Sequence, residues 1–273
     1  MQQKRVVITG IGLVTSLGND VASTWQHLVQ GKSGAGSITH FDASKFKTQF
    51  ACEVKNLDMS LLLDSKELRR YDRYIHYAIK SAEEAMQDAQ INVNHEDALR
   101  CGVIYGSGMG GINTLDVNIG GFGAGDGTPR YTPFFIPMII TNMAAGMLAI
   151  RYGFKGVNFA TTSACSSSAH AIANACYQIR MGLADIILTG GSEAAVECSG
   201  VGAKHMDVWV CALFLGVQGR NHESPAVLVI GKCGHDKCVP RYFCQFQNSR
   251  SGLSSQYLFG WFPIAAQWCR VGA

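Results

Sequence analysis

One cysteine stands where the surrounding sequence can make a thiol reactive. Residues 157–172 read as a short apolar strand, a turn of small residues that contains Cys165, and the start of a helix. The first turn of a helix leaves backbone N–H groups without intrahelical partners, and the helix dipole is positive at that end. A thiol at this position is expected to ionise more readily, so Cys165 is predicted to be a nucleophile.

The residues beside Cys165 favour access to its sulfur. Ala164, Ser166, Ser167 and Ser168 are all small and leave room for a substrate. The structural alternative is an inert, small apolar residue in the core, which is the commoner role of a cysteine. Spacing alone leaves both interpretations open, so the other segments have to decide between them.

Length and composition limit the class of protein. The 273 residues are 47% apolar and 16% charged and include 31 glycines, which favours a buried α/β core with tight turns over disorder. A net charge of +3 is too small to indicate nucleic-acid binding, and no apolar run reaches 18 residues, so no membrane span is expected. The chain starts without a signal-peptide pattern, which predicts a cytoplasmic protein with free thiols.

The N-terminal segment is predicted to be a buried strand. Residues 5–12 are a β-branched run ending in Gly10 and Gly12, which indicates a strand followed by a turn. This strand and glycine turn also suggest a dinucleotide-binding enzyme, a different class of function. Thr15 stands where the third glycine of that motif belongs, so the nucleotide hypothesis is weak.

Two helices are expected in the first 90 residues. The first covers residues 21–30, with Trp25, Leu28 and Val29 on its apolar face. A glycine- and serine-rich connection to about residue 41 and irregular residues 42–64 follow it. The second begins after Asp72, which can accept hydrogen bonds from its first turn. Its apolar residues recur at intervals of four, three and four: Ile75, Ile79, Ala82 and Met86.

The middle of the chain combines a strand with two unusual loops. Residues 101–105 are a second strand, and they lead into Gly106–Gly111, whose glycines predict close backbone approach to a neighbouring element or a ligand. Residues 132–137 read as an apolar loop between prolines. Its adjacent aromatic residues, Phe134 and Phe135, are expected to need burial against a core, a partner subunit or an acyl chain.

The segment after residue 140 has the pattern of a parallel sheet. A helix is expected over residues 142–152, and the helix after Cys165 is expected to end at Gly182. Residues 185–194 form a further apolar strand with a glycine turn. A strand, a helix and a strand in succession predict a parallel sheet whose two faces are covered by helices.

These segments together resemble one enzyme family. The motifs that carry the resemblance are Arg5–Gly12, Lys66–Asp72, Gly106–Gly111, Pro133–Pro137, Thr162–Ala171 and Gly190–Ala195. In this order, residues 4 to about 203 resemble the 3-oxoacyl-[acyl-carrier-protein] synthase II family, the condensing enzymes of fatty-acid elongation. The resemblance implies a thiolase-like α/β fold of two similar halves in a homodimer. Residues 1–203 would form the N-terminal half, a parallel-rich sheet with covering helices.

The resemblance also implies a reaction in two stages. Cys165 would take an acyl group from acyl carrier protein, with its own backbone N–H as one oxyanion donor. Malonyl carrier protein would then lose carbon dioxide and attack that thioester. No cofactor and no metal ion is implied.

Further residues receive roles through the same resemblance. Met109 matches a family residue beside the acyl tunnel. Phe135, and less directly Phe134, matches an aromatic residue at the dimer contact that lines the tunnel of the other subunit. The expected dock for the carrier protein is basic, and ordinary surface charge is the alternative for its residues: Lys66, Arg69 and Arg70.

The resemblance ends near residue 203. The family's second half supplies a His-Gly-Thr turn, a Gly-His pair preceded by a lysine, and a Gly-Phe-Gly-Gly loop, none of which occurs here. Residues 204–273 are therefore read as an unmatched tail, out-of-frame or misjoined, so that the second half is absent or replaced. Periodicity in this tail is poor apart from a possible strand at Ala226–Ile230.

Two other accounts of the tail remain open. The first is a replacement segment with its own role, and the second is a divergent second half. A replacement could hold zinc through Cys233, Cys238, Cys244 and His235, although this spacing matches no strong zinc pattern.

Two functions follow from these observations. The first is an acyltransferase whose condensation step is slow or absent, because the histidines that stabilise the developing charge are missing. The second is a non-catalytic fragment, or a partner that forms a dimer with an intact synthase.

Overall fold

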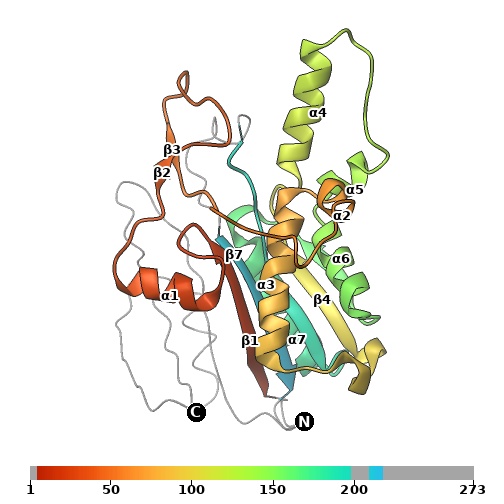
Figure 1. The fold of residues 1–273 in the computed structure, drawn as a ribbon. Helices are drawn as coiled ribbons and strands as arrows, with labels where there is room; N and C mark the ends of the chain where they lie inside the picture. Colours follow the sequence, from red (N-terminus) through yellow and green to blue (C-terminus); the bar gives the residue numbers. More distant parts are fainter. Residues whose placement is uncertain (1–4, 198–208, 218–273) are drawn as a thin grey trace. The chain divides into compact units, whose positions relative to one another are not determined.

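The computed structural model describes residues 5–197 and the backbone of residues 209–217 (Figure 1). All of them belong to one compact unit, residues 1–223. A five-stranded sheet in the order β1-β7-β6-β4-β5 forms its centre. The strands are β1 (Val6–Thr15), β4 (Cys101–Gly106), β5 (Asn158–Thr161), β6 (Ile186–Gly191) and β7 (Trp209–Val217).

The sheet is mixed rather than wholly parallel. Strands β5 and β6 both pair in parallel with β4, so the strand–helix–strand prediction for this segment is confirmed. Strand β7 runs antiparallel to both β6 and β1, and β1 therefore has the same direction as β6.

The position of β7 was not expected from the sequence. It extends over residues 209–217, within the segment read as an unmatched tail, and pairs with β1 from Val6↔Val217 to Thr15↔Trp209. Its other edge pairs with β6, so this part of the tail belongs to the central sheet. The expected strand at Ala226–Ile230 and the cysteines of the zinc alternative lie outside the described residues.

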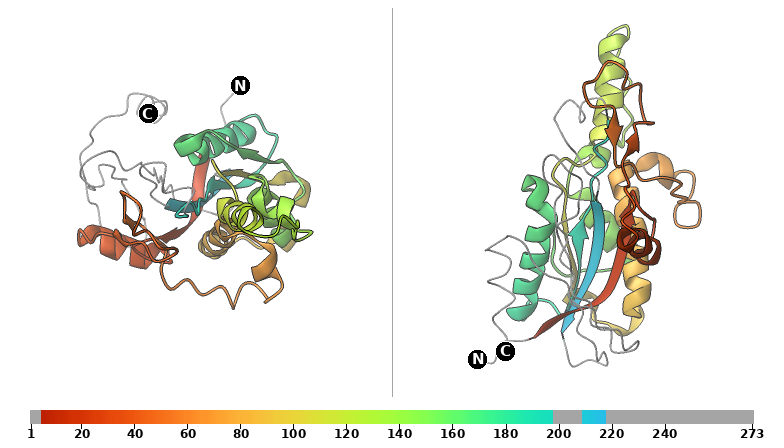
Figure 2. Two further views of the ribbon diagram at one scale, coloured as in Figure 1. Left: turned by 90° about the horizontal axis from the view of Figure 1, so that it is seen from above. Right: turned by 90° about the vertical axis from the view of Figure 1, so that its left-hand side faces the viewer.

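Helices cover both faces of the sheet (Figure 2). One face carries α3 (Arg73–Ala89) and α6 (Met143–Tyr152), and the other carries α7 (Ser167–Arg180). The apolar positions predicted for α3 are all buried, at 1%, 2%, 0% and 8% exposure for Ile75, Ile79, Ala82 and Met86. Both predicted covered faces are confirmed.

Glycines inside β1 allow α3 to lie close to the strand. The predicted turn at Gly10 and Gly12 is wrong, because β1 continues through both residues to Thr15. A methyl group on Gly10 would overlap the carbonyl oxygen of Ala85 in α3, and one on Gly12 would overlap that of Ser81. The spacing of the two glycines therefore serves close packing of a helix on a strand.

The same helix satisfies the outer edge of β1. The backbone N–H of Ile11 donates to Asp88 Oδ2 at 3.0 Å, and that of Leu13 donates to Glu84 Oε2 at 2.9 Å. An edge strand normally presents unpaired N–H groups that attract other strands. Here carboxylates of α3 occupy them.

The first helix is peripheral. Asp20 caps α1 (Val21–Val29) by accepting a hydrogen bond from Ser23 N at 2.6 Å. The apolar face predicted for this helix is not buried, since Trp25 is 43% and Val29 66% exposed. The residues between α1 and α3 contain three short elements: β2 (Gly36–Ser37), β3 (Phe50–Ala51) and α2 (Glu67–Arg70).

The apolar segment near residue 135 is a helix rather than the predicted loop. Helix α5 (Phe135–Ile139) starts directly after Phe134, and Pro137 is its third residue. Proline is tolerated there because N–H groups in the first helical turn have no intrahelical acceptor. The remaining elements are α4 (Ile112–Ala124) and the 3₁₀ turns η1 (Val93–His95), η2 (Ala98–Arg100) and η3 (Ala164–Ser166).

Alanine substitutions at two glycines should have opposite effects on stability. Gly12→Ala forces a methyl group into the α3 backbone and should lower the free energy of unfolding by about 2 kcal/mol. Gly146 lies inside α6 with open space around it, so Gly146→Ala should raise that free energy by about 0.5 kcal/mol. Urea unfolding measures both. Equal effects of the two substitutions would contradict the packing described for β1.

Candidate functional site

Cys165 lies on a tight turn between β5 and α7. The turn is η3, and α7 begins two residues after Cys165. The Cys165 side chain is exposed, so a substrate has access to it. Both geometric conditions for the predicted nucleophile, access and a nearby helix start, are therefore met. Its catalytic role stays a prediction.

Ser167 holds the backbone of this turn. Its buried hydroxyl accepts a hydrogen bond from Ser163 N at 2.9 Å and donates one to the Ala164 carbonyl at 2.7 Å. The Ser167 carbonyl in turn accepts from Thr161 Oγ1 at 2.7 Å. Ala164 has a φ of +49°, a conformation that L residues seldom adopt. These bonds stabilise the strained backbone directly before Cys165.

A histidine that the sequence analysis did not consider lies beside the turn. His170 Nδ1 is 2.6 Å from Ser163 Oγ, and both residues flank Cys165 along the chain. His170 is on the first turns of α7 and is exposed. The signal for it was its position five residues after the candidate nucleophile, at the start of the same predicted helix.

The glycine loop after β4 packs against the cysteine turn. A methyl group on Gly106 would lie 2.5 Å from the Ser167 backbone, and one on Gly108 would lie 3.2 Å from Ala164 Cα. The predicted close approach of backbones is confirmed. Met109 directly follows Gly108, so the structure brings it near the Cys165 turn. Its side chain is 37% exposed. Its role beside an acyl tunnel stays a prediction.

A second residue that the sequence analysis did not consider, Glu193, binds this loop through hydrogen bonds. Its Oε1 atom accepts hydrogen bonds from Gly108 N and from Ser107 Oγ. Burial raises the pKa of Glu193 to about 7, although the donors of the loop act in the opposite direction. An acidic residue two positions after the buried strand β6 was the available signal in the sequence.

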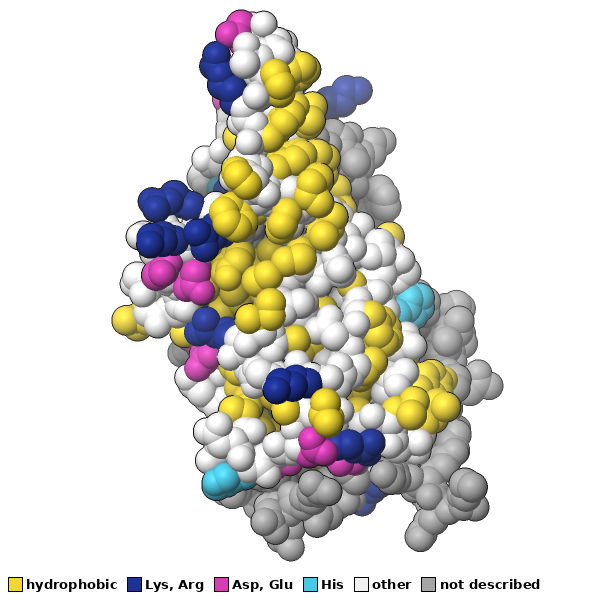
Figure 3. Space-filling view, turned by 90° about the vertical axis from the view of Figure 1, so that its right-hand side faces the viewer, with side chains coloured by type: hydrophobic (Ala, Val, Ile, Leu, Met, Phe, Trp, Pro, Cys, Tyr) yellow, Lys and Arg dark blue, Asp and Glu magenta, His cyan; other side chains and the backbone are white. Residues whose placement is uncertain are grey.

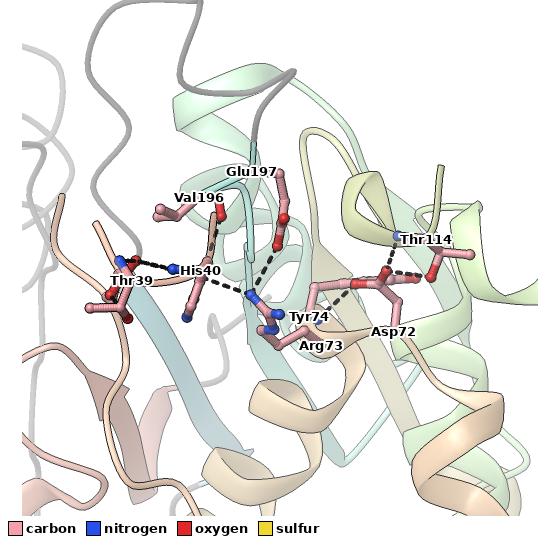
Figure 4. Close-up of polar contacts among 9 residues, drawn as sticks. Thr39, His40, Asp72, Arg73, Tyr74, Thr114, Val196 and Glu197 are labelled. Carbon is pink, nitrogen blue, oxygen red and sulfur yellow. Dashed lines mark hydrogen bonds and ion pairs between the residues drawn. The ribbon is translucent and has the colours of Figure 1, made fainter. Parts of the chain in front are cut away.

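Asp72 ties the start of α3 to the start of α4 (Figure 4). It is 1% exposed, and besides capping α3 through Tyr74 N at 3.2 Å it binds the start of α4. Its Oδ2 atom accepts from Thr114 N at 2.8 Å and from Thr114 Oγ1 at 2.6 Å. The Tyr74 hydroxyl donates to the Ile140 carbonyl at 2.6 Å, just after α5. The start of α4 and the residue after α5 are thus held by hydrogen bonds from Asp72 and from α3.

The neighbouring residue Arg73 forms a separate contact with the segment after β6 (Figure 4). Its Nη1 atom is 2.9 Å from Glu197 Oε1 and 2.8 Å from His40 Nδ1. The same His40 Nδ1 atom also lies 3.3 Å from the Val196 carbonyl oxygen. This contact links the residues after β6 to α3 and to the N-terminal loops.

The two predicted aromatic residues lie at an apolar surface. Phe135 stacks on Tyr131 with ring centroids 5.0 Å apart, and Phe134 is 36% exposed. Figure 3 shows apolar side chains gathered along this face. The exposed large apolar residues on and between α4 and α5 are Leu115, Val117, Ile119, Phe122, Tyr131, Phe134 and Ile136.

The basic residues border this apolar surface. Lys66, Arg69 and Arg70 are exposed on and beside α2. The guanidinium carbon of Arg70 lies 4.5 Å from the centroid of the Phe134 ring, a cation–π contact. Two predicted sets of site residues, the dock and the aromatics, are therefore adjacent in space.

Neither a metal site nor a membrane-spanning helix is found in the part of the chain that the structure describes. No group of three or more His, Cys, Asp or Glu side chains among residues 5–197 is arranged to hold a metal ion. In the same part of the chain, no helix has the length and apolar character needed to cross a membrane.

Comparisons with known proteins agree on one family. Residues 3–206 match the protein family described as Beta-ketoacyl synthase, N-terminal domain. A 3-oxoacyl-[acyl-carrier-protein] synthase 2 of Coxiella burnetii is 43% identical over 202 residues, which are 74% of this chain and 49% of the relative. One of Staphylococcus aureus is 42% identical over 195 residues, 71% of this chain and 47% of the relative. The chain spans about half the length of the curated relatives it matches.

Solved structures support the fold. The ishigamide ketosynthase/chain length factor superposes with a TM-score of 0.72 at 24% identity, covering 79% of this chain and 59% of that one. At this identity the likeness concerns the fold alone. The predicted thiolase-like α/β class and the predicted family resemblance are both confirmed.

Removal of the Ser167 hydroxyl should loosen the cysteine turn. Ser167→Ala leaves the Ser163 N–H and the Ala164 carbonyl without their partner, which should lower the free energy of unfolding by about 1–2 kcal/mol. Ser166→Ala changes a neighbouring, exposed serine and should have almost no effect. Thermal unfolding of both variants measures the difference, and equal midpoints would speak against the role given to Ser167.

Proposed function

Because the chain belongs to the beta-ketoacyl synthase family, we propose that it transfers an acyl group from an acyl carrier protein thioester to Cys165. The observation that carries this proposal is the exposed thiol on a strained turn at the start of α7. In the step, the sulfur attacks the thioester carbonyl and forms a new thioester, while the carrier leaves as a free thiol. The Cys165 backbone N–H is proposed as one donor to the developing oxyanion.

The proposed reaction of this chain stops at acyl transfer. In the family, condensation in fatty-acid elongation requires malonyl-thioester decarboxylation, which creates an enolate that must be stabilised. The sequence lacks the His-Gly-Thr and Lys…Gly-His motifs that the family uses for this. Without such donors the second stage is expected to be slower by orders of magnitude.

The surroundings of Cys165 support roles for the other predicted residues. Met109 is proposed to contact the acyl chain, because its loop packs on the cysteine turn and its side chain is partly exposed. Phe134 and Phe135 are proposed to line the acyl tunnel across a homodimer contact, because they lie on a broad apolar surface. Such surfaces mark association sites.

The same apolar surface favours a second candidate function. A chain that lacks the condensation groups can still associate through α4 and α5 with an intact synthase. The exposed residues of this face support association equally in both cases. The cytoplasmic location is part of the first proposal, because Cys165 must be a reduced thiol to act.

Acyl transfer predicts a covalent adduct on one thiol. Incubation with an acyl carrier protein thioester should add one acyl group, seen by intact mass spectrometry, and Cys165→Ala should abolish it. Cys176→Ala should keep the adduct, because burial raises the pKa of the Cys176 thiol and holds it in its unreactive form. Addition of malonyl carrier protein should leave the adduct largely unconverted. An adduct that persists in Cys165→Ala would refute the proposal.

The dock is tested by reversing charge without touching Arg70. Lys66→Glu combined with Arg69→Glu should slow loading from an acyl carrier protein at least tenfold at low salt, because an acidic partner is then repelled. Loading from a small uncharged thioester should be unchanged. Lys32→Glu reverses an exposed charge elsewhere and is the matched control. If the basic residues are ordinary surface charge, the unchanged protein, the double variant and Lys32→Glu should all be loaded at equal rates.

A further inference from the structure

Glu193 is a partly buried carboxylic acid whose Oε2 atom is shielded from solvent. It lies two residues after β6, and its Oε1 atom accepts hydrogen bonds from Gly108 N and from Ser107 Oγ, the latter at 3.3 Å. The backbone N–H of Met109 also stabilises its carboxylate. Its Oε2 atom is buried and has no hydrogen-bond partner within the described residues. A glutamine would make the same contacts without the cost of burying an ionisable group.

The carboxyl group, the glycine loop and the cysteine turn are stacked on one another. A methyl group on Gly108 would lie 3.3 Å from Glu193 Oε1 and 3.2 Å from Ala164 Cα. The glycine loop and the cysteine turn therefore meet at Gly108, where any side chain would be crowded. Thr162 Oγ1 also donates to the Ser107 carbonyl at 3.1 Å, and Ser107 N donates to the Thr161 carbonyl at 3.2 Å. A shift of the loop must consequently reach the residues that precede Cys165.

Within the described residues, no cationic side chain is among the groups that act on the Glu193 carboxylate. The groups that interact with its carboxylate are the donors of residues 107–109, and burial is the largest influence on its pKa, which it raises to about 7. Tyr74 faces it from α3, with Asp72 beside that tyrosine. On the α7 side of the turn, the titratable groups are Cys165 and His170. Glu193 therefore gains or loses its proton near neutral pH.

We infer that Glu193 is a positioning residue whose ionised carboxylate fixes the Ser107–Gly110 loop, and Met109 with it, against the Cys165 turn. An ionised oxygen accepts hydrogen bonds more strongly than that of a neutral acid, so protonation weakens the hold on the loop. The inference rests on the proposed function in one respect, since it takes Cys165 to be the acyl-accepting thiol. In consequence, the fit between the Met109 side chain and the acyl group on Cys165 is tighter above neutral pH than below it.

The test follows the Met109 methyl group by NMR in a Cys165→Ala background, where no thiol of this turn can titrate. With ¹³C-labelled methionine, the Met109 signal, assigned through its loss in Met109→Leu, should move with pH around a midpoint near 7. Adding Glu193→Gln should abolish this movement, because the amide does not ionise. Adding Ser192→Ala, which alters an adjacent buried hydroxyl, should leave the midpoint unchanged.

Each result decides the question. A Met109 signal that does not move near pH 7, or that moves equally in Glu193→Gln because His170 causes the change, overturns the inference. If Glu193→Gln fails to fold, Ser107→Ala serves in its place. Loss of that hydroxyl donor should move the midpoint to higher pH, and an unchanged midpoint overturns the inference. The measurement involves no acylation, so its failure is distinct from the absence of an acyl adduct on Cys165.

Discussion

The site depends on direct backbone contact where the carboxyl ends of β4 and β6 meet the start of α7. Gly106 and Gly191 leave no room for side chains here. A methyl group on Gly106 would lie 2.5 Å from the Ser167 backbone, and one on Gly191 would lie 2.7 Å from the Gly106 carbonyl oxygen. This contact sets the height of the cysteine turn above the sheet. The strained φ of Ala164 is tolerated because backbone and hydroxyl groups on every side constrain it.

Local patterns predicted the elements whose reasons are local. The α3 helix was readable because a capping aspartate precedes an apolar stripe, and the Cys165 turn because small residues separate a strand from a helix. Elements with non-local reasons were missed. Gly10 and Gly12 indicated a turn, whereas their purpose is to admit a helix whose residues lie about 70 positions later. Glu193 was overlooked because its partners are in a loop more than 80 residues earlier.

Two further differences have the same origin. Prolines around Phe134 and Phe135 suggested a loop, yet Pro137 sits in a first helical turn, where its missing N–H has no cost. Strand β7 went unrecognised because the sequence around it lacks periodicity, and its pairing with two strands shows only in the sheet. The family resemblance supplied the candidate Met109, which no pattern indicated, and it named a carrier protein as the partner of the basic residues. Their adjacency to the cysteine turn and to Phe134 emerged only in three dimensions.

The place of β7 has a consequence for how the chain reaches its fold. Strand β1 is among the first segments to leave the ribosome, but its sheet neighbour within the described residues is made about 200 residues later. During synthesis β1 can pack against α1, α3 and α7 but has no strand beside it until β7 is made. Contacts so distant along the chain slow folding and prolong exposure of apolar surface. The nascent protein is therefore at greatest risk of aggregation until residue 217 has emerged.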